Sequence, residues 1–314
     1  MKELWPAVTT ESELDSLKQR GAELMPGVKV IADRHGLDPV PVRRYEVGSL
    51  PVFEMDGDRV LKLYPGIYAD DHMVEAAVMG RLEGGPSAPR RLACGEVQGW
   101  RYILMSKLEG RDLATAWNDL TSSDRQGVAE DLGRWLAELH CVAWEGLELA
   151  HPPWSRFIAK QLDGATQRQR GLGLGEPWLS RMAPFLDAVS VDRVGRDLVL
   201  LHTEIAREHV FVAQRGGRWR VTGVLDFEPS MIGSREYEFA SVGMFASVSD
   251  AGFLRALLLA YGFRQDELDH TLRRRFMAYT LLHRYSHLGW YLRRMPPGPG
   301  VECLEALADE WWAW

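Results

Sequence analysis

Two short stretches of the sequence bring together residue types that can move protons and hold metal ions. The stretch His202–His209 (HTEIAREH) directly follows the apolar, strand-like run Leu198–Leu201. The stretch Asp226–Glu228 (DFE) begins 17 residues after His209, at the end of a second apolar run. A carboxylate at a strand end can bind a metal ion, and a loop carboxylate can accept a proton from a hydroxyl group. Asp226 could equally cap a turn, and its type and position alone leave both interpretations open.

A lysine and a glutamate upstream add the parts that bind phosphate groups. Lys62 lies in the strand-like run Arg59–Leu63, and Glu75 follows it by 13 residues on a segment predicted to be helical. In phosphoryl transfer a lysine holds the nucleotide phosphates, a helix carboxylate holds that lysine, and a metal-binding aspartate neutralises charge. Lysine, helix glutamate, catalytic loop and metal aspartate occur here in the order that kinases use. This order favours phosphoryl transfer over the other roles open to each residue.

The first third of the chain is predicted to form short strands and one helix that position these residues. The strands are expected at Pro51–Met55, Arg59–Tyr64 and Trp100–Lys107. The dipeptide Asp56-Gly57 joins the first two and is typical of a hairpin turn. A helix is expected over residues 70–82, with Asp70 or Asp71 as its N-cap and Gly84-Gly85 at its end.

The rest of the chain is predicted to be mainly helical, with a β hairpin at its centre. Ser123-x-x-Gln126 is a capping-box pattern, and the apolar residues behind it recur at helical spacing. Further helices are expected over residues 235–247, 250–262 and 265–293, and the hairpin strands over His209–Ala213 and Trp219–Phe227. These patterns predict an α+β, bilobal fold with a small β-rich lobe over residues 1–105 and a larger helical lobe over residues 106–314. The boundary is expected at the link Met105–Gly110.

The motifs together resemble the aminoglycoside phosphotransferase family of protein-kinase-like small-molecule kinases, and most of all its hygromycin kinase branch. The metal segment Gly223–Phe227 resembles the family's G-x-[IV]-D-[WF], and Gly233–Ala240 resembles its G-D-x-x-Y-D-L-A run. Val60–Tyr64 resembles the phosphate-lysine strand, and Tyr102–Gly110 resembles the hinge between lobes. The resemblance spans roughly residues 45–262 in the right order and implies the bilobal protein-kinase-like fold.

The resemblance also implies a role for each matching residue, with ATP or GTP as the phosphoryl donor and Mg²⁺ or Mn²⁺ as the cation. Lys62 would contact the α- and β-phosphates, with Glu75 orienting it. The Gly48-Ser49 turn would lie over the nucleotide, and the backbone from Ser106 to Leu108 would bind the purine. Asp226 would hold the metal, and His202 would support the catalytic loop. The catalytic residues implied are Glu204 and Asp226, and the metal ligands are Asp226 and His209.

Several positions depart from the family pattern. Glu204 stands where the family has its catalytic aspartate, and its carboxylate reaches about one methylene farther. His209 replaces the metal-binding asparagine; it could act through water, favour Mn²⁺ or not be a ligand. Thr203 replaces a glycine and should stiffen the turn, and Ser234 replaces the aspartate of the later run. Two functions therefore stay open besides nucleotidyl transfer: a working small-molecule kinase, or a degenerate kinase-like protein that binds a nucleotide, small molecule or protein without phosphoryl transfer.

Acidic residues near the two motifs are the candidates for binding the acceptor molecule. Family members phosphorylate hydroxyl groups on aminoglycosides, other antibiotics or metabolites, and their acceptor pocket is often acidic. The candidates here are Glu208, Glu228, Glu236 and Glu238. An acidic cluster would suit an aminoglycoside-like or other amine-bearing acceptor, although some of these residues could instead pair with Arg207 and Arg235. The polar helix Arg273–Arg294 could line the same cleft or simply pack.

Composition and charge exclude several other classes of protein. The 314 residues carry a net charge of −7 with an isoelectric point near 5.8, which argues against a nucleic-acid partner. The three cysteines, Cys94, Cys141 and Cys303, are far apart, so neither a disulfide framework nor a zinc site is expected. No apolar run approaches the ~18 residues of a membrane span, and the N-terminus does not resemble a secretory signal. We therefore expect a cytoplasmic protein, monomeric or homodimeric, whose partner is a small-molecule acceptor.

Overall fold

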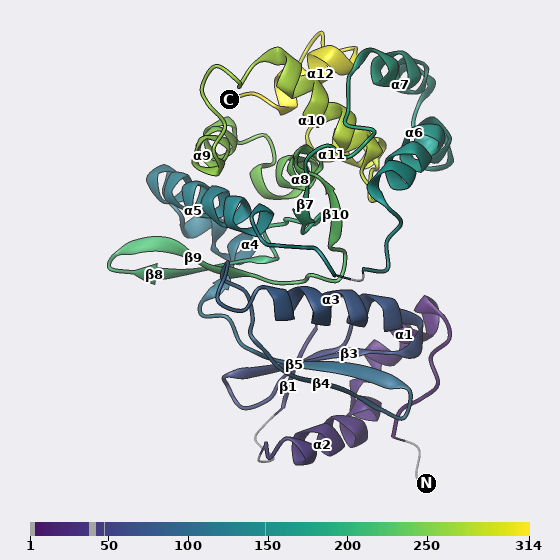
Figure 1. The fold of residues 1–314 in the computed structure, drawn as a ribbon, viewed down its shortest axis with the longest axis vertical. Coiled ribbons are helices and arrows are strands. Elements are labelled where there is room, and N and C mark those ends of the chain that lie inside the picture. Colours follow the sequence, from purple (N-terminus) through teal and green to yellow (C-terminus); the bar gives the residue numbers. More distant parts are fainter. Residues whose placement is uncertain (1–3, 38–41, 47, 148) are drawn as a thin grey trace.

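The computed structural model describes residues 4–37, 42–46, 48–147 and 149–314, and its N-terminal part is built on one antiparallel sheet (Figure 1). The strand order is β1-β2-β3-β5-β4. The strands are β1 (Arg43–Tyr45), β2 (Val52–Glu54), β3 (Arg59–Tyr64), β4 (Arg91–Val97) and β5 (Trp100–Ser106). The three predicted strands of this region are confirmed as β2, β3 and β5. In β3 the register places Lys62 opposite Ile103 of β5, so Lys62 sits in a central strand of the sheet.

Helices cover both faces of this sheet, and one of them separates it from the rest of the molecule. Helix α3 (Ala69–Arg81) lies between the sheet and the helical part, and α2 (Met25–Arg34) lies on the opposite face (Figure 1). The predicted helix over residues 70–82 is therefore confirmed as α3. Its predicted N-cap is wrong: Tyr68 holds the N-cap position without a side-chain bond, because a 3₁₀ turn leads directly into the helix. Asp70 and Asp71 lie in the first turn, where negative charge suits the helix dipole.

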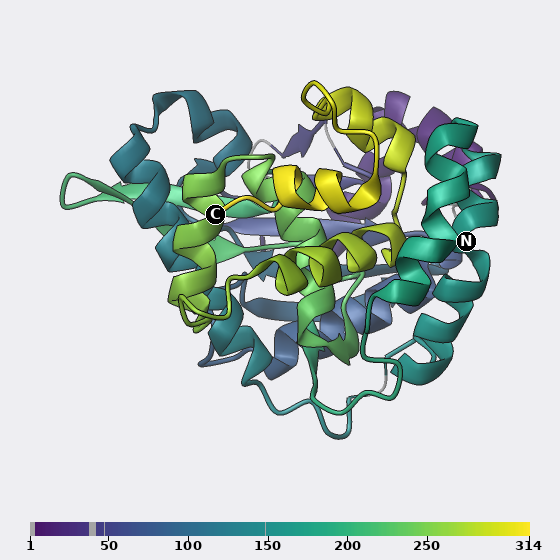
Figure 2. The same cartoon turned by 90° about the horizontal axis from the view of Figure 1, so that it is seen from above.

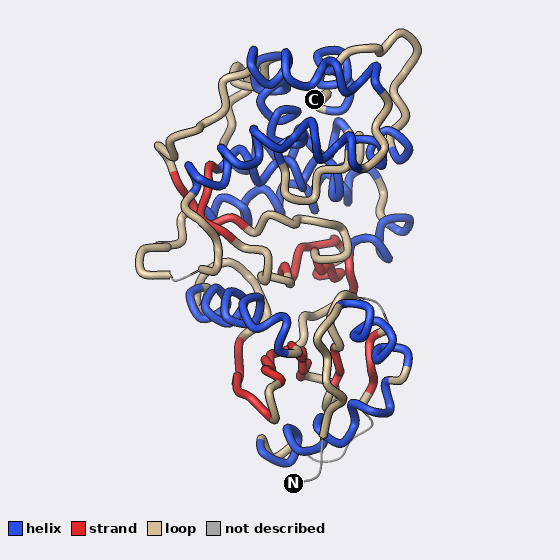
Figure 3. Tube along the Cα trace, turned by 90° about the vertical axis from the view of Figure 1, so that its right-hand side faces the viewer, coloured by secondary structure: helices blue, strands red, loops and turns tan. Residues whose placement is uncertain are grey.

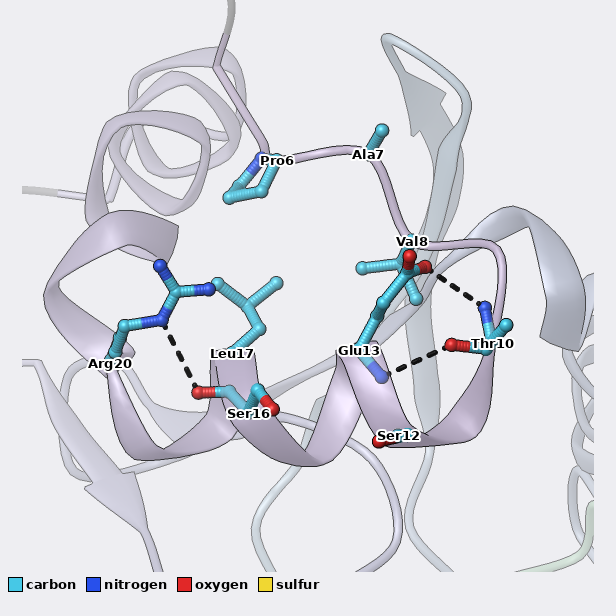
Figure 4. Close-up of a pocket in the computed structure, with 9 residues that line it drawn as sticks. All are labelled: Pro6, Ala7, Val8, Thr10, Ser12, Glu13, Ser16, Leu17 and Arg20. Atoms are coloured by element: carbon cyan, nitrogen blue, oxygen red, sulfur yellow. Dashed lines mark hydrogen bonds between the residues drawn. The ribbon is translucent and has the colours of Figure 1, made fainter.

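The prediction of a single helix in the first third of the chain is wrong, because α1 (Glu11–Gln19) and α2 precede the sheet. The start of α1 is fixed by a capping box in which Thr10 Oγ1 accepts from the Glu13 N–H, while the Glu13 carboxylate accepts from the Thr10 N–H (Figure 4). Trp5, which precedes α1, packs against α2, since a Cβ added at Gly27 of α2 would lie 2.1 Å from its ring. The Trp5 ring stacks on Trp100 of β5, with 5.3 Å between the ring centroids.

The C-terminal part is mainly helical, with two small sheets on the side that faces α3 (Figures 1 and 3). Strand β6 (Arg111–Asp112) pairs with β8 (Val210–Arg215), which pairs with β9 (Arg218–Val224), and β7 (Leu198–Leu201) pairs with β10 (Met231–Ser234). The predicted hairpin is thus confirmed as β8 and β9. The helices are α4 (Leu113–Ala116), α5 (Ser122–His140), α6 (Trp154–Gly171), α7 (Glu176–Ala188), α8 (Arg235–Ser241), α9 (Ala251–Tyr261), α10 (His270–Leu282), α11 (Leu288–Arg294) and α12 (Leu304–Trp311).

Figure 2 shows α10 and α12 together on the outer side of this part, away from α3. Strand β5 ends at Ser106, and the next strand, β6, pairs in a different sheet. We therefore propose that the two lobes divide at residues 105/106. No helix in the described ranges has both the length and the apolar character needed to cross a membrane.

Two helix boundaries differ from their predictions. The capping box of α5 is formed by Thr121 and Asp124, not by Ser123 and Gln126: Thr121 Oγ1 accepts from the Asp124 N–H, and the Asp124 carboxylate accepts from the Thr121 N–H. Aspartate at the fourth position of this pattern can bind the N-cap N–H as glutamine does, and the Thr121–Asp124 pair comes earlier in the chain than Ser123–Gln126.

The single helix predicted over residues 265–293 is wrong, because the chain breaks between α10 and α11 at residues 283–287. His283 has an extended backbone there, and its Nε2 lies 2.9 Å from the backbone oxygen of Thr203. The end of α10 thus coincides with a contact to the loop after β7, 80 residues away in sequence. Periodicity along the chain carries no signal of such a contact. The predicted helix over residues 235–247 is also modified, since α8 continues as a π-helical turn, Val242–Ser247.

Helices α5 and α9 cross where a glycine removes the side chain between their backbones. A Cβ added at Gly133 of α5 would lie 2.3 Å from the backbone oxygen of Leu257 in α9. We expect Gly133→Ala to lower the free energy of unfolding by about 1–3 kcal/mol, because backbone atoms cannot make way as a flexible side chain can. Urea denaturation followed by circular dichroism measures this change.

Gly127, on the same helix, provides the matched control. A Cβ there would meet nothing within 4 Å. Gly127→Ala should therefore stabilise the protein by roughly 0.5–1 kcal/mol, since alanine favours the helix and restricts the unfolded chain. If the two substitutions changed the free energy of unfolding equally, the space between α5 and α9 would be large enough for a side chain at Gly133.

Candidate active site

Three carboxylates surround the ammonium group of Lys62. Its Nζ lies 2.8 Å from Glu75 Oε2, 2.5 Å from Asp226 Oδ1 and 2.8 Å from Glu228 Oε2. Glu75 comes from α3, whereas Asp226 and Glu228 follow β9 at the start of the loop to β10. The structure thus brings together Lys62, Glu75 and Asp226 from three separate elements. It adds Glu228, which sequence reasoning had assigned to the acceptor.

Glu75 connects the two lobes through both of its carboxylate oxygens. Oε2 accepts from Lys62 Nζ and from the Tyr64 hydroxyl, 2.5 Å away, while Oε1 accepts from the backbone N–H of Phe227 at 3.3 Å. The residue is only 2% exposed. A buried carboxylate with three donors has little freedom to move, so Glu75 fixes both the lysine and the segment that follows Asp226.

The charges in this cluster are strongly coupled. Burial acts to lower the pKa of Lys62, but Asp226 and Glu75 outweigh it and raise that pKa well above its usual value. Burial raises the pKa of Asp226, yet the positive charges of Lys62 and His209 hold it at about 2. Burial raises the pKa of Glu228 to about 8, with Lys62 opposing. One ammonium therefore faces more carboxylates than it can neutralise, and this environment suits an additional cation.

The loop that follows β7, His202–His209, is bound through its backbone by Glu238 of α8. Its Oε2 accepts from the His202 N–H at 2.7 Å, and its Oε1 accepts from the Thr203 N–H at 2.8 Å. His140 Nε2 lies 3.5 Å from Oε2. Burial acts to raise the pKa of Glu238, but the hydrogen bond from His140 and the other partners outweigh it and leave that pKa lowered. Glu238 therefore fixes the loop as an ionised, buried acceptor.

Thr203 adopts a backbone conformation that normally favours glycine. Its φ is +70°, which is strained for a β-branched residue. Besides the bond from Thr203 N–H to Glu238, Thr203 Oγ1 donates to the backbone oxygen of Pro229 at 2.9 Å, and the Thr203 backbone oxygen accepts from His283 Nε2. These bonds stabilise the turn in place of the glycine expected there. His202 is fully buried, and its Nε2 lies 3.0 Å from the Leu225 backbone oxygen.

Glu204 and His209 meet Asp226 at the end of this loop. His209 Nδ1 lies 2.8 Å from the Glu204 backbone oxygen, and His209 Nε2 lies 3.4 Å from Asp226 Oδ2. A carbonyl oxygen only accepts, so Nδ1 carries the hydrogen, and in the neutral imidazole Nε2 holds the lone pair. Burial raises the pKa of the Glu204 carboxyl, and the charge of His209 partly opposes this.

The residues present fit a divalent cation. Carboxylate oxygens of Glu75, Asp226 and Glu228 lie within 4.8 Å of one another. Oxygen ligands suit Mg²⁺ and Mn²⁺, and the Nε2 atom of His209 adds a nitrogen donor that suits Mn²⁺ better than Mg²⁺. Glu75 is already occupied by three donors, which leaves Asp226, Glu228 and His209 as the groups that could hold the ion.

The segments predicted to bind the nucleotide base and phosphates lie around β1, β2 and β5. Gly48, with φ of +125°, and Ser49 present their backbone oxygens to Lys18 Nζ, at 3.2 and 3.1 Å. Ser106 N–H already donates to the Arg90 backbone oxygen at 2.9 Å. Lys107 N–H donates to the Asp58 backbone oxygen at 2.8 Å, whereas the Leu108 N–H makes no backbone hydrogen bond with a described residue.

The acidic residues predicted to bind the acceptor do not form one cluster. Glu228 contacts Lys62, and Glu238 is buried under the catalytic loop. Glu236 is bound by Arg275 through two hydrogen bonds of 2.8 and 3.0 Å, at the end of β10 farthest from Met231. Glu208 is exposed. The four carboxylates therefore occupy four different environments.

Two cavities lie outside this cluster. One, beside α1, is lined by Pro6, Ala7, Val8, Thr10, Ser12, Glu13, Ser16, Leu17 and Arg20 (Figure 4). The other is lined by residues of the 187–197 segment together with Ser234, Arg235, Glu236, Arg275 and Tyr279. Neither contains Lys62, Glu204 or Asp226. The Glu236–Arg275 pair lines the second cavity, which further separates Glu236 from the cluster.

Sequence reasoning missed several residues that shape the site. Tyr64 was predicted only as the last residue of a strand. Because residues i and i+2 of a strand lie on the same face, its hydroxyl can reach Glu75, the partner of Lys62. The sequence also contained a signal for the role of Glu238. An acidic residue between apolar ones on a predicted helix is either exposed to water or buried with hydrogen-bond donors around it. Arg284 and Tyr285 were predicted only as part of the helix Arg273–Arg294, because the break at residues 283–287 involves a contact between distant segments.

Glu238→Gln is expected to destabilise the protein by roughly 1–3 kcal/mol at pH 7, because one of the two loop N–H groups would face an amide NH₂ instead of an oxygen. The pKa of Glu238 is lowered on folding, so its stabilisation is present above about pH 4.5 and is lost as the pH falls. The difference between parent and variant should therefore shrink on acidification, in urea titrations at several pH values. Glu236→Gln, in a partly exposed ion pair, is the control and should change stability by about 1 kcal/mol or less.

Comparison with known proteins agrees with this arrangement. A family model described as "Phosphotransferase enzyme family" matches residues 42–276. Aminoglycoside 2'-phosphotransferase-IIIa in its GDP complex superposes with a TM-score of 0.70 at 17% identity, over 92% of this chain and 98% of that one. A thermostable mutant of aminoglycoside phosphotransferase APH(4)-Ia, with ADP and hygromycin B, gives 0.59 at 15%, over 90% and 97%. APH(3'')-Id from Streptomyces rimosus gives 0.54 at 15%, over 82% and 98%. The chain has the kinase-like fold of these enzymes and belongs to the phosphotransferase enzyme family.

Proposed function

We propose that this protein transfers the γ-phosphoryl group of ATP or GTP to a hydroxyl group of a small molecule. The observation that carries the proposal is the meeting of Lys62, Glu75 and Asp226 within hydrogen-bond distance, from β3, α3 and the segment after β9. Phosphoryl transfer depends on positioning and charge neutralisation, and these residue types supply both. Two of the similar structures hold GDP or ADP, which supports the use of a nucleotide by this protein.

Each residue of the cluster takes one part of the proposed reaction. Lys62 would bind the α- and β-phosphates, held in place by Glu75. Asp226, Glu228 and His209 would hold Mg²⁺ or Mn²⁺, which neutralises the negative charge of the phosphates. The Gly48-Ser49 turn would cover the nucleotide. The Leu108 N–H, with the Ser106 backbone oxygen, would bind the purine.

Glu204 would act on the acceptor. Its carboxylate accepts the proton of the acceptor hydroxyl as that oxygen bonds to the γ-phosphorus and the bond to the β-phosphate oxygen breaks, so that a nucleoside diphosphate leaves. A carboxyl group whose pKa is raised by burial is a better base near neutral pH than an exposed one. We retain the hygromycin kinase branch and a cytoplasmic location as predictions from the sequence.

Mass analysis of reaction products tests this proposal. The protein is incubated with ATP or GTP, with Mg²⁺ or Mn²⁺, and with a panel of hydroxyl-bearing acceptors. We expect an acceptor that has gained one phosphate, together with the nucleoside diphosphate. An acceptor carrying a whole nucleotide would indicate nucleotidyl transfer instead. Nucleotide binding, seen by thermal shift, without any product would favour a kinase-like binding protein.

A further inference from the structure

Arg284 lies beside the catalytic loop, in the break between α10 and α11. Its backbone N–H donates to the Tyr237 hydroxyl at 2.9 Å, and the preceding residue, His283, contacts the backbone oxygen of Thr203. The charge of Arg284 acts to lower the pKa of Glu204, which burial raises. Through His283, Arg284 is therefore held at the loop that carries Glu204, the proposed partner of the acceptor hydroxyl.

The guanidinium of Arg284 has no ion-pair partner among the described residues. Its Nη2 donates to the thioether sulfur of Met231 at 3.0 Å, and its Nε is buried with no hydrogen-bond partner. The ring of Phe157 lies 5.9 Å from Cζ. A thioether is a weak acceptor, and the other groups that bond to this partly buried guanidinium, the hydroxyls of Tyr237 and Tyr285, carry no charge to balance it. No carboxylate in the described part of the chain therefore pairs with this positive charge.

The nearest titratable groups do not supply that charge. Burial, with the charge of Arg284, lowers the pKa of His151 to about 4, so this imidazole is neutral at pH 7. Burial and the charge of Glu204 raise the pKa of Tyr285 to about 12, so its hydroxyl is neutral as well. Glu204 and Asp71 influence Arg284 only at longer range and form no ion pair with it.

Two further polar atoms in the same region lack partners. His151 Nε2 and Ser230 Oγ are buried without a hydrogen bond in the described part of the chain, and Ser230 is fully buried. Ser230 precedes Met231, the residue that Arg284 contacts, and its backbone interacts with His151. Buried polar groups are nearly always paired, so unpaired ones gathered around a guanidinium indicate a polar ligand.

We propose that the acceptor carries an anionic group, a carboxylate or a phosphate, which Arg284 binds while the acceptor hydroxyl faces Glu204. The planar guanidinium can bind either anion through two parallel hydrogen bonds, and Ser230 and His151 provide additional polar contacts. The same charge repels a polycationic acceptor. The inference rests on the proposed function, and it replaces the amine-bearing acceptor expected from the acidic residues, since Glu236 and Glu238 are bound elsewhere.

The test uses four compounds that share a glycerol-like skeleton and differ in charge: D-glycerate, glycerol 3-phosphate, glycerol and 3-amino-1,2-propanediol, with kanamycin as a polycation. The nucleotide site is first filled with a non-hydrolysable ATP analogue and Mg²⁺, and each compound is then titrated calorimetrically. We expect at least one of the two anions to bind, and to bind at least about 10-fold more tightly than the amine or kanamycin. The carboxylate and phosphate arms distinguish the two anion types.

Variants of Arg284 complete the test. Arg284→Gln should weaken anion binding by roughly 10–100-fold while leaving the affinity for the ATP analogue unchanged. Arg284→Lys keeps the charge but not the planar guanidinium, so its affinity for the anion should lie between those of the parent and Arg284→Gln. Arg274→Gln, at an exposed position on α10, should bind the anion as tightly as the parent. Preferential binding of kanamycin or the amine, anion binding that Arg284→Gln does not change, or no anion binding by the parent would overturn the inference. Failure of the ATP analogue to bind would instead count against the proposed function.

Discussion

Asp226→Ala is expected to abolish phosphoryl transfer, with a loss on the order of 1,000-fold or more in kcat. Asp226 contacts Lys62 at 2.5 Å, faces His209 and shares a possible cation site with Glu228. Its pKa of about 2 keeps it ionised throughout the range in which enzymes work. Removing this carboxylate takes away a cation ligand and the partner that orients the lysine. Steady-state assays with saturating nucleotide and metal measure the loss.

Two further variants separate chemistry from folding. Asp226→Asn keeps the shape of the side chain but not its charge, and it should lose nearly as much activity as the alanine variant. Asp163→Ala, at an exposed position on α6, should retain the parent rate. All three should unfold cooperatively in a thermal melt. An Asp226→Ala protein that phosphorylates as fast as the parent would show that the metal assignment is wrong.

Glu204→Gln is expected to lower kcat by at least about 100-fold with little change in the KM for the nucleotide. The amide cannot accept the proton of the acceptor hydroxyl, while it preserves the length of the side chain. The loop itself should stay in place, because Glu238 and His283 hold its backbone independently of the Glu204 side chain. The measurement is a full kinetic analysis in which nucleotide and acceptor concentrations are varied separately.

Glu204→Asp tests whether the position of this carboxylate matters as well as its charge. The family pattern has aspartate here, but this loop carries Thr203 at φ +70° and His209 in contact with the Glu204 backbone. We expect Glu204→Asp to retain more activity than Glu204→Gln and less than the parent, since a displacement of ~1 Å can reduce the rate about 100-fold. Full activity of Glu204→Gln would remove the proposed base.

The elements that carry Lys62, Glu75 and Asp226 could be predicted from the sequence because their signals are local. Alternating strands and a turn dipeptide define β2 and β3, and helical periodicity defines α3. The order of lysine, glutamate and aspartate then indicated which side chains would meet. The predicted Lys62–Glu75 pair is present at 2.8 Å, whereas the direct contact between Lys62 and Asp226, at 2.5 Å, was not predicted.

The parts that could not be predicted depend on contacts between distant segments. Glu228 reaches Lys62 because Asp226 adopts a φ of +77°, which turns the chain sharply after β9. Arg284 reaches the catalytic loop because His283 ends α10. A helical pattern continues through both halves of that segment, so the sequence predicted one helix where the fold has two. The acceptor site was therefore predicted from acidic residues and from the helix Arg273–Arg294 as a whole.

The central claim is that Lys62 and Asp226 converge on a nucleoside triphosphate and its cation, and calorimetric titration of a non-hydrolysable ATP or GTP analogue tests it most directly. The parent protein should bind the analogue more tightly with Mg²⁺ or Mn²⁺ than without. Lys62→Met should weaken binding by about 10–100-fold, and Asp226→Asn should remove most of the metal dependence. Binding that is equal in all three proteins and independent of metal, or no binding at all, would contradict the account.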